Sequence, residues 1–600
     1  MIKVSDYIAA YIAALGIRHA FAITGGASIH MIHSIGERDD IDFICPHHEQ
    51  AGAMAADAYA RVSGNLGCAI ATSGPGATNL VTGIACAWFD SVPVLYLTGQ
   101  VARFRFKGDT GVRQMGFQET DIVSMVKPIT KYAVMVTQAE DLGPELTKAV
   151  AIARDGRPGP VLVDIPDDLQ REMVDPKVLG PLPSVTAPAA IKRDAVDPAK
   201  LDAVLAMIRA AERPVLVIGA GVRLSGAVDD IHSLIERLDM PVCPSWAAAD
   251  IIPADDPLLA GTFGTHGTRA GNFTVQNADL VLAIGARLST RETGSPTTSW
   301  ARGAKTVIVD VDPTELAKFP AFQKPLDLSI QADAGRFIRA LLDRAAGENL
   351  PAFTAWKQQV TDWRGRYPVC PAAYHTERET NPYVFIETLS EQLDEDDILV
   401  VDTGCAVAWT MQGFRFKRGQ RALHAFNNTP MGYALPGAIG AAYARGGRRV
   451  ICIAGDGSLM MNLQELATAQ HHRLPIKLFL VNNDGYAMVQ QTQEQWLGAK
   501  YFATSAAGGL SFPDFSLIAG ACGFAYNRID ENREIADRIH AALNTEGPTF
   551  CDVHISSRHR VLPQCKFGRP IEDSEPLLPR EEFLANMIVD PMPASLTDDD

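Results

Sequence analysis

The feature that most constrains the fold of this sequence is a repeated alternation of short apolar runs with longer alanine-rich stretches. The longer stretches, such as residues 51–62, have the length and composition of helices. The apolar runs are rich in Val, Ile and Leu, which is typical of strands buried on both faces of a parallel sheet. They lie at residues 92–97, 161–165, 215–218, 280–284, 307–309, 398–401, 450–453 and 476–481. The alternation predicts an α/β fold of doubly wound parallel sheets.

The length of the chain sets the number of such sheets. At about 150 residues per domain, 600 residues predict three or four domains. Two stretches that are rich in proline or in polar residues, 172–199 and 342–382, have the composition of linkers. We therefore predict three α/β domains and a tail, with the bounds 1–171, 195–343, 378–560 and 561–600.

Composition excludes several classes of protein. Hydrophobic residues make up 47% and charged residues 21%, an ordinary globular balance that excludes a disordered or fibrous chain. The 54 Lys and Arg against 70 Asp and Glu give a net charge of −16, which argues against nucleic acid or an anionic membrane as the main partner. No apolar run reaches the roughly 18 residues that a membrane span needs.

The cysteines and the first residues bear on location. None of the ten cysteines belongs to a C-x-x-C pair, so neither a zinc ribbon nor a dithiol redox site is indicated. Residues 1–21 show an amphipathic helical pattern rather than the charged and apolar segments of a signal peptide. We expect a soluble, cytoplasmic protein.

The strongest chemical signal follows two of the apolar runs. One run leads into Gly455, Asp456 and Gly457, and the next ends at Asn483, 27 residues after Asp456. This separation fits one β-α-β crossover, which would place both polar side chains at the carboxyl edge of neighbouring strands, where open α/β sheets bind ligands. The carboxylate and the amide oxygen are hard donors suited to Mg²⁺. Gly457 and Ser458 open a helix, and a helix N-terminus favours a phosphate. A Gly-Asp-Gly alone would more often be a tight turn, but the crossover and the asparagine favour a binding site.

These motifs together resemble the diphosphate–Mg²⁺ signature of the thiamine-diphosphate enzymes. The resemblance implies that Mg²⁺ is held by Asp456, Asn483 and the Gly485 carbonyl. The residues that it implies for the cofactor in this domain are Cys405, Gly455, Gly457, Ser458 and Met488.

The resemblance also requires a glutamate on the first domain that protonates the aminopyrimidine ring of the cofactor. Glu49 follows a strand-like run at residues 41–45 and begins an alanine-rich helix. A helical glutamate is usually solvated, but the small residues that follow this one indicate a buried setting. Burial would raise the pKa of the carboxyl group and suit it to proton exchange with a neutral ring.

Further motifs resemble the acetohydroxyacid synthase (acetolactate synthase) branch of that family. They lie at residues 25–27, 73–76, 98–100, 117–120, 156–160 and 431–436, and the similarity extends from the start of the chain to about residue 560. The resemblance implies that Met431 is the apolar wedge that bends the cofactor and that the Thr429 carbonyl accepts a hydrogen bond from its amine. It adds Gly26 and Gln118 to the catalytic residues, and Gln100 and Phe117 to the substrate contacts.

The middle domain is similar to the FAD-binding domain of the same branch. The flavin would be structural, since the acetohydroxyacid synthase reaction has no net redox step. Each glycine motif is weak by itself because turns also use glycine. The residues implied for FAD are Arg157, Gly219, Gly221, Gly264, Thr265, His266, Gly285, Arg287, Asp310 and Val311.

The acceptor side departs from the family pattern. Thr492 stands where the family has a tryptophan, and Asp167 stands where it has a lysine. The loop at residues 101–116 is several residues longer, whereas Arg291 matches the arginine that meets the acceptor carboxylate. These changes predict a larger acceptor pocket with a weaker attraction for a second keto acid.

The tail, residues 561–600, extends beyond the usual end of the family. It is similar to acetolactate-synthase-like carboligases that add an acetyl unit to a nucleotide-bound keto-deoxysugar. A structural alternative is an arm packed on a neighbouring subunit.

The expected function is a carboligase that decarboxylates pyruvate and transfers the acetyl unit to a ketone or aldehyde. Acetolactate synthase proper, a hydrolase of cyclic diketones and a pyruvate oxidase are alternatives within the same fold. A non-catalytic cofactor-binding regulator needs no proton relay, so the presence of Glu49 together with Asp456 and Asn483 argues against it. The family implies a homodimer or homotetramer in which Glu49 of one chain meets the diphosphate site of another. The small residues at 52–60 are compatible with such close helix contact.

Overall fold

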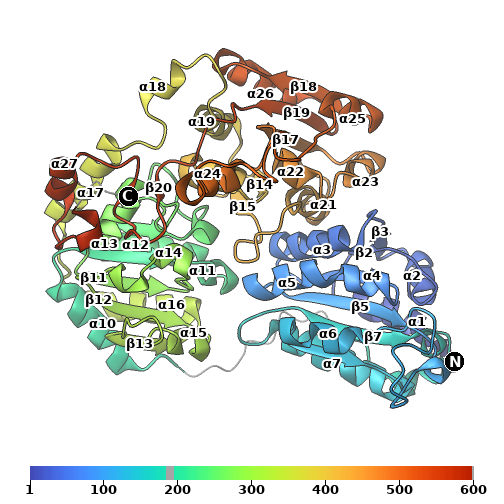
Figure 1. Cartoon of the computed structure of the whole chain (residues 1–600). Coiled ribbons are helices and arrows are strands. Elements are labelled where there is room, and N and C mark those ends of the chain that lie inside the picture. Colours follow the sequence, from blue (N-terminus) through green and yellow to red (C-terminus); the bar gives the residue numbers. More distant parts are fainter. Residues whose placement is uncertain (184–194, 597–600) are drawn as a thin grey trace.

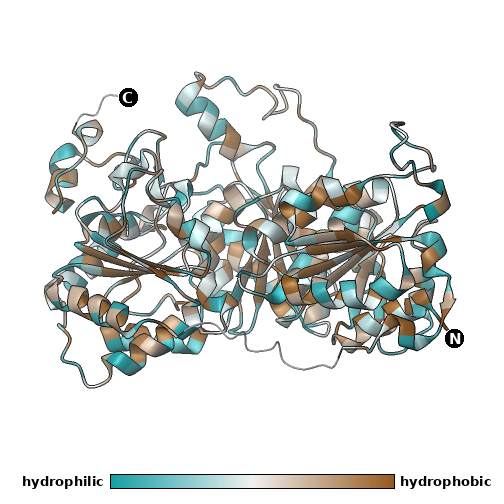
Figure 2. Cartoon of the chain, turned by 90° about the horizontal axis from the view of Figure 1, so that it is seen from below, coloured by the Kyte–Doolittle hydropathy of each residue, from teal (hydrophilic) through white to brown (hydrophobic). Residues whose placement is uncertain are grey.

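The computed structural model describes residues 1–183 and 195–596. The middle of the predicted linker 172–199 therefore lies outside the described residues. Three parallel sheets follow one another along the chain, and Figure 1 shows them as separate groups in blue to cyan, green, and orange to red. In Figure 2 the strands are drawn mostly in brown, because they carry apolar side chains on both faces. The prediction of an α/β fold with three doubly wound sheets is confirmed.

The N-terminal sheet has six parallel strands in the order β3-β2-β4-β5-β7-β6. Its direction of winding reverses between β2 and β4, which is the position where a sheet of this kind binds ligands. Its strands are β2 (His19–Ala22), β3 (Asp42–Ile44), β4 (Gly67–Ala71), β5 (Val94–Gln100), β6 (Tyr132–Met135) and β7 (Val161–Pro166). Its helices are α1 (Val4–Ala14), α2 (Ile29–Gly36), α3 (Glu49–Ser63), α4 (Pro75–Asn79), α5 (Val81–Asp90), α6 (Ile122–Val126), α7 (Ala139–Arg154), α8 (Asp167–Gln170) and α9 (Pro176–Leu179). An antiparallel pair, β1 (Ile2–Lys3) with β8 (Met173–Val174), joins the two ends of this domain.

The central sheet has five parallel strands in the order β10-β9-β11-β12-β13 and reverses between β9 and β11. Its strands are β9 (Pro214–Ile218), β10 (Val242–Pro244), β11 (Leu280–Ile284), β12 (Lys305–Asp310) and β13 (Leu328–Gln331). Its helices are α10 (Pro198–Ala210), α11 (Gly221–Leu224), α12 (Val228–Leu238), α13 (Arg269–Asn277), α14 (Thr290–Thr293), α15 (Pro313–Ala317) and α16 (Ala334–Ala345). Two further helices, α17 (Thr354–Arg366) and α18 (Ala372–His375), lead on to the last domain.

The C-terminal sheet has six parallel strands in the order β15-β14-β16-β17-β19-β18 and reverses between β14 and β16. Its strands are β14 (Ile398–Val401), β15 (Arg421–Leu423), β16 (Val450–Gly455), β17 (Ile476–Asn482), β18 (Ala525–Ile529) and β19 (Thr549–His554). Its helices are α19 (Pro382–Gln392), α20 (Cys405–Gly413), α21 (Ala434–Ala444), α22 (Asp456–Leu459), α23 (Glu465–His471), α24 (Ala487–Trp496), α25 (Phe515–Ala521) and α26 (Ile535–Asn544).

Small residues let helices of the first and last domains pack closely within one chain. A Cβ atom on Gly440 of α21 would lie 2.0 Å from the backbone oxygen of Ala55 in α3. Side chains of α3, α5 and α21 then form one apolar core that both domains share. The close helix contact predicted at residues 52–60 therefore exists, but its partner is α21 of the same chain, so this contact is no evidence for a dimer.

The tail packs on the central domain of its own chain, where Figure 1 shows α27 (Arg580–Asn586) in dark red beside green elements. Phe583 lies in the apolar core of that domain. Asn586 accepts a hydrogen bond from the indole of Trp363 at 2.8 Å, and Glu572 forms an ion pair with Arg302 at 2.8 Å. A short antiparallel pair, β20 (Gln564–Cys565) with β21 (Ser574–Glu575), precedes this helix. The described part of the tail thus has its partners within the same subunit.

Candidate functional site

The carboxyl edge of the C-terminal sheet brings together the three residues predicted as metal ligands. Asp456 follows β16 at the point where the winding reverses. Its Oδ1 accepts a hydrogen bond from the Gly457 N–H at 2.6 Å, and its Oδ2 accepts from the N–H groups of Asn483 at 3.1 Å and Gly485 at 3.2 Å. The two chain segments, 27 residues apart, are therefore fixed to one another through a single carboxylate.

Two features of this cluster fit a divalent cation. The Oδ1 atom of Asn483 is buried and has no hydrogen-bond partner among the described residues. Burial raises the pKa of Asp456 to about 7, although the three backbone N–H groups oppose this. A divalent cation would give the amide oxygen a partner and would offset the cost of burying the carboxylate.

Asp402, which the sequence analysis missed, lies beside this cluster at the end of β14. It accepts hydrogen bonds from the N–H groups of Gly432 and Ala434, both at 3.0 Å. Burial raises its pKa to about 6. These bonds hold the segment that carries Met431, the predicted wedge, at the carboxyl edge of the sheet. The signal that could have revealed it is an acidic residue directly after an apolar run.

The other residues predicted for the cofactor in this domain surround the same edge. A Cβ atom on Gly457 would lie 2.1 Å from the ring of Tyr486, so the start of α22 is pressed against that ring. Thr429 has a φ angle of 43°, in the left-handed region. Gly455 ends β16, Met431 and Met488 are half-buried, and Ser458 and Cys405 are buried.

Glu49 lies at the corresponding edge of the N-terminal sheet, as the first residue of α3. Its Oε2 accepts a hydrogen bond from Asn79 at 2.9 Å, a partner that the sequence analysis did not identify. The ten residues that follow, 51–60, are buried, but Glu49 itself is only half-buried. The expectation of a buried carboxyl is therefore wrong for the single chain, because a residue that begins a helix at an open sheet edge keeps one side exposed.

The other predicted residues of this edge lie around the reversal between β2 and β4. Apart from its chain neighbours, no described residue has an atom within 4 Å of a Cβ placed on Gly26, so the space beside its backbone is open. Gln118 has a φ angle of 64° and packs against Gly74, while Phe117 is 82% exposed. This edge of the sheet is therefore open to solvent in the single chain.

Gln100 lies beneath this surface in the single chain, and its contact with a substrate stays a prediction. The side chain is buried, and its amide donates to Asp164 at 2.9 Å and to the Thr120 carbonyl at 2.7 Å. Its oxygen accepts from the Val101 N–H at 3.0 Å. Gln100 therefore fastens both ends of the long loop to the sheet.

A cavity of about 1430 Å³ lies among all three domains. Many of the predicted flavin and substrate residues line it, namely Arg157, Gly221, His266, Gly285, Arg287, Arg291, Asp310, Val311, Thr429 and Met488. The cavity thus extends from the reversal point of the central sheet to the cofactor edge of the C-terminal sheet.

Glycines let two loops at the edge of this cavity pack closely against each other. A Cβ atom on Gly219 would lie 2.2 Å from the Gly285 oxygen, and one on Gly221 would lie 2.7 Å from the Gly285 Cα. Gly264 and Thr265 lie behind the wall, where the Thr265 N–H donates to the Arg291 carbonyl at 2.8 Å. A cavity with bare backbone at a reversal point fits the diphosphate of a dinucleotide such as FAD.

Arg157 is held by carboxylates rather than left free for a phosphate. Its Nη1 lies 3.1 Å from Asp312 and 2.9 Å from Glu315, and its Nε donates to Ser91 at 2.8 Å. The guanidinium group therefore bridges the N-terminal and central domains, and its predicted contact with a flavin diphosphate would have to share these partners.

Arg291 and His266 form the part of the cavity wall that is best suited to an anion. The guanidinium carbon of Arg291 lies 3.3 Å from the centre of the Trp246 ring, and its buried Nη2 has no partner among the described residues. Burial lowers the pKa of Arg291 to about 10, so it stays charged at neutral pH. Burial, reinforced by Arg291, lowers the pKa of His266 to about 3, and neither of its ring nitrogens has a partner in the described parts of the chain. The sequence analysis missed Trp246, whose role depends on a contact between distant segments.

Thr492 lies on the exposed side of α24, and its hydroxyl donates to the Met488 carbonyl at 3.3 Å. One turn further on, the exposed ring of Trp496 lies 5.4 Å from that of Phe567 in the tail. In the single chain Thr492 therefore faces outward, beside an aromatic pair.

Comparison with known protein families assigns all three sheets. Residues 2–125 match the N-terminal TPP binding domain of the thiamine pyrophosphate enzymes, residues 201–341 match their central domain, and residues 402–553 match their C-terminal TPP binding domain. The chain belongs to the thiamine pyrophosphate enzymes. The domain order is the one that the sequence motifs predicted.

Among the thiamine pyrophosphate enzymes, the chain is similar to acetolactate synthases along nearly its whole length. It is 36% identical over 587 residues to a probable chloroplastic acetolactate synthase 2 of Oryza sativa subsp. japonica, covering 95% of this chain and 86% of the relative. It is 35% identical over 563 residues to the acetolactate synthase large subunit of Parasynechococcus marenigrum, covering 92% and 88%. The predicted acetolactate synthase-like branch is therefore confirmed.

Two observations bear on location. Among the described residues, no helix combines the length and the hydrophobicity that crossing a membrane requires. The rice relative is named as a chloroplastic protein, so the cytoplasmic setting expected from the sequence stays a prediction.

Proposed function

We propose that this protein is a thiamine-diphosphate-dependent carboligase that decarboxylates pyruvate and transfers the acetyl unit to a ketone or aldehyde. The observation that carries the proposal is the cluster around Asp456, which follows β16 at the reversal of the sheet, together with the Asn483 amide oxygen, which has no partner among the described residues. Membership of the family and the acetolactate synthase names of the relatives support pyruvate as the donor.

In this proposal the C-terminal domain holds the charged end of the cofactor. Asp456, Asn483 and the Gly485 carbonyl bind Mg²⁺, which neutralises the diphosphate beside Gly457 and Ser458. Thiamine diphosphate supplies an electron sink for the loss of CO₂ from a 2-keto acid. Met431 packs against the cofactor from the segment that Asp402 holds in place.

The N-terminal domain supplies the proton relay. Glu49 exchanges a proton with the aminopyrimidine ring, and Asn79 orients its carboxylate through the 2.9 Å hydrogen bond. Gly26 leaves room for the aminopyrimidine ring, and Gln118 and Phe117 cover the reacting end of the cofactor. A second chain that covers the open edge would complete the burial that Glu49 lacks in a single chain.

FAD is proposed to occupy the large cavity in a structural role. The volume of the cavity, the bare backbone of Gly221 and Gly285 in its wall, and the carboxyl group of Asp310 at the end of β12 support this assignment. Arg291 and His266 then bind either a phosphate of the flavin or the anionic group of the acceptor, because a guanidinium group recognises carboxylate and phosphate alike.

The acceptor is proposed to be bulkier than pyruvate. Thr492 and Asp167 stand where the family has a tryptophan and a lysine, so the acceptor side lacks a large side chain and a positive charge. The long loop fastened by Gln100 adds surface at the edge of the N-terminal sheet. The runner-up is acetolactate synthase proper, the activity that the names of the relatives state for those proteins.

One assay separates these two functions. Purified protein with Mg²⁺ and thiamine diphosphate is given pyruvate, with and without larger ketones or aldehydes, and CO₂ and product masses are measured. We expect the larger acceptors to be preferred over pyruvate by roughly 10–200-fold, the range that about 1–3 kcal/mol of discrimination in the pocket gives. Thr492→Trp should shift the product toward acetolactate. A wild type that makes only acetolactate, whatever ketone is offered, would establish the runner-up instead.

A further inference from the structure

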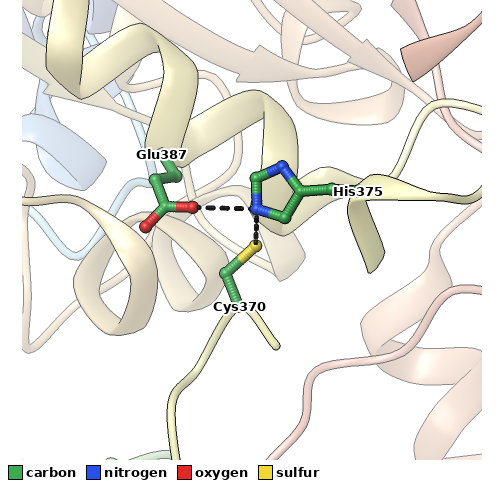
Figure 3. Close-up of side chains that lie close together, drawn as sticks. All are labelled: Cys370, His375 and Glu387. Carbon is green, nitrogen blue, oxygen red and sulfur yellow. Dashed lines mark hydrogen bonds and ion pairs between the residues drawn. The ribbon is translucent and has the colours of Figure 1, made fainter. Parts of the chain in front are cut away.

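Three side chains able to bind a metal meet in the segment that joins the central and C-terminal domains, outside the site described above. Cys370 lies between α17 and α18, His375 ends α18 and Glu387 lies in α19, and Figure 3 shows their side chains pointing toward one another. Their ligand atoms all lie within 4.8 Å of each other. We propose that these three residues bind a zinc ion.

The distances between the donor atoms fit tetrahedral zinc. The Nε2 atom of His375 lies 3.5 Å from the Cys370 Sγ and 3.2 Å from the Glu387 Oε2. Zinc bonds of about 2.3 Å to sulfur and about 2.0 Å to nitrogen or oxygen place tetrahedral ligands roughly 3.3–3.6 Å apart. The two separations from His375 Nε2 are close to these values, so a zinc ion would require little movement of Cys370 or Glu387 relative to the histidine.

The two contacts of His375 also meet at a single ring nitrogen, as the dashed lines of Figure 3 show. In a relay of nucleophile, histidine and acid, the two neighbours contact opposite ring nitrogens, so that the imidazole passes a proton between them. Here Cys370 and Glu387 both contact Nε2, and a single proton on that atom cannot form good hydrogen bonds to both. Three donors that face one point are the arrangement that a metal ion requires.

The donor set selects the class of metal. Sulfur, imidazole and carboxylate together favour Zn²⁺ over Mg²⁺, which prefers oxygen donors. This site would therefore not compete with the Asp456 cluster for its ion. The His375 side chain is 48% exposed, so an ion can enter from solvent and water can fill the fourth position. The Nη1 of Arg415 lies 3.6 Å from Glu387 Oε1, on the oxygen that does not face the histidine.

The proposed ion would fasten the predicted linker to the C-terminal domain. Cys370 and His375 belong to the stretch 342–382, whereas Glu387 belongs to α19, which packs on α20 and α26. If the linker and α19 bind the same ion, the ion restricts the movement of the linker in the folded state. Zinc binding should therefore stabilise the folded protein.

The test uses the full-length protein, stripped of metals with a chelator and resupplied with Mg²⁺ and thiamine diphosphate. Calorimetric titration with Zn²⁺ alone should show one tight site per chain. Thermal unfolding should show a higher melting temperature with zinc than without it. Cys370→Ser and His375→Ala should each weaken this binding at least tenfold. Matched controls outside the cluster, Cys522→Ser and His540→Ala, should leave it unchanged.

Cobalt gives a second readout that does not depend on activity. Co²⁺ bound through a thiolate shows sulfur-to-metal charge-transfer absorption, which we expect in wild type and in Cys522→Ser but not in Cys370→Ser. If Cys370→Ser does not fold, Glu387→Gln must weaken zinc binding in its place. Absence of a tight zinc site, or zinc binding that survives all three ligand substitutions, would overturn the proposal.

Discussion

Asp456 carries more of the proposed site than any other single residue. Its carboxylate is buried, accepts three backbone hydrogen bonds and lies beside an amide oxygen that has no partner among the described residues. A carboxylate that served only to hold the loop would leave Asn483 Oδ1 unexplained, because a buried polar atom without a partner costs free energy. A bound cation explains both observations.

Asp456→Asn is therefore expected to lose Mg²⁺ and thiamine diphosphate together. The substitution keeps the shape of the side chain but removes the charge that the cation needs. We expect cofactor affinity, measured by calorimetry, to fall more than about 100-fold, beyond the 10–100-fold typical of residues that only orient a ligand. The matched control is the exposed neighbour Asp484→Asn, which should bind normally. Normal binding by Asp456→Asn would remove the basis of the metal assignment.

Asp164 predicts a pH dependence of stability. Burial raises its pKa to about 7, against hydrogen bonds from Thr98 and Gln100 that lower it. In the unfolded chain the pKa is roughly 3.9, so folding takes up a proton between about pH 4 and pH 7. The free energy of unfolding should fall as the pH rises through this window, by up to about 1.4 kcal/mol per pH unit from this group, and should level off above it.

Urea unfolding of wild type and Asp164→Asn across the same pH range measures this contribution. The asparagine has no proton to lose, so the stability of wild type relative to the variant should decline from pH 4 to pH 7. Two curves that run parallel through the window would show that Asp164 does not titrate as described.

At the scale of elements, the sequence was most informative where function lies at the ends of strands. Asp456 and Asn483 could be placed because a β-α-β crossover of known length brings the ends of adjacent strands to one edge. Asn79 and Trp246 could not be placed, since their roles come from contacts between segments that are distant in sequence. Asp402 could have been placed by the same strand-end rule, because it directly follows the apolar run of β14. Local pattern also could not say which helix the small residues of α3 would meet.

Helix contact gives a prediction about stability. Gly440→Ala in α21 would place a Cβ atom 2.0 Å from the Ala55 oxygen, so the two helices would have to separate. We expect a loss of about 1–3 kcal/mol in the free energy of unfolding, measured with denaturant. Gly520→Ala in α25 is the control, because no other described part of the chain lies within 4 Å of a Cβ placed there and alanine favours a helix. Equal effects of the two substitutions would contradict the packing described.

At the scale of the whole molecule, the site is present as two halves. Glu49 and Gly26 lie at the edge of the N-terminal sheet, and Asp456 and Met431 lie at the edge of the C-terminal sheet. The half-exposed Glu49 and the 82% exposed Phe117 leave the first edge open in a single chain. We propose that a second chain completes the site, with Glu49 of one subunit facing the diphosphate site of the other.

Mixing two inactive variants tests this account most directly. Glu49→Gln cannot exchange the ring proton and Asp456→Asn cannot hold the metal, so each alone should show almost no release of CO₂ from pyruvate. When both are unfolded and refolded together, or produced in one cell, a mixed dimer has one site with both substitutions and one site with neither. Random pairing then predicts recovery of about one quarter of the wild-type activity. No recovery in mixed dimers that are shown to form would contradict a carboligase site shared between chains.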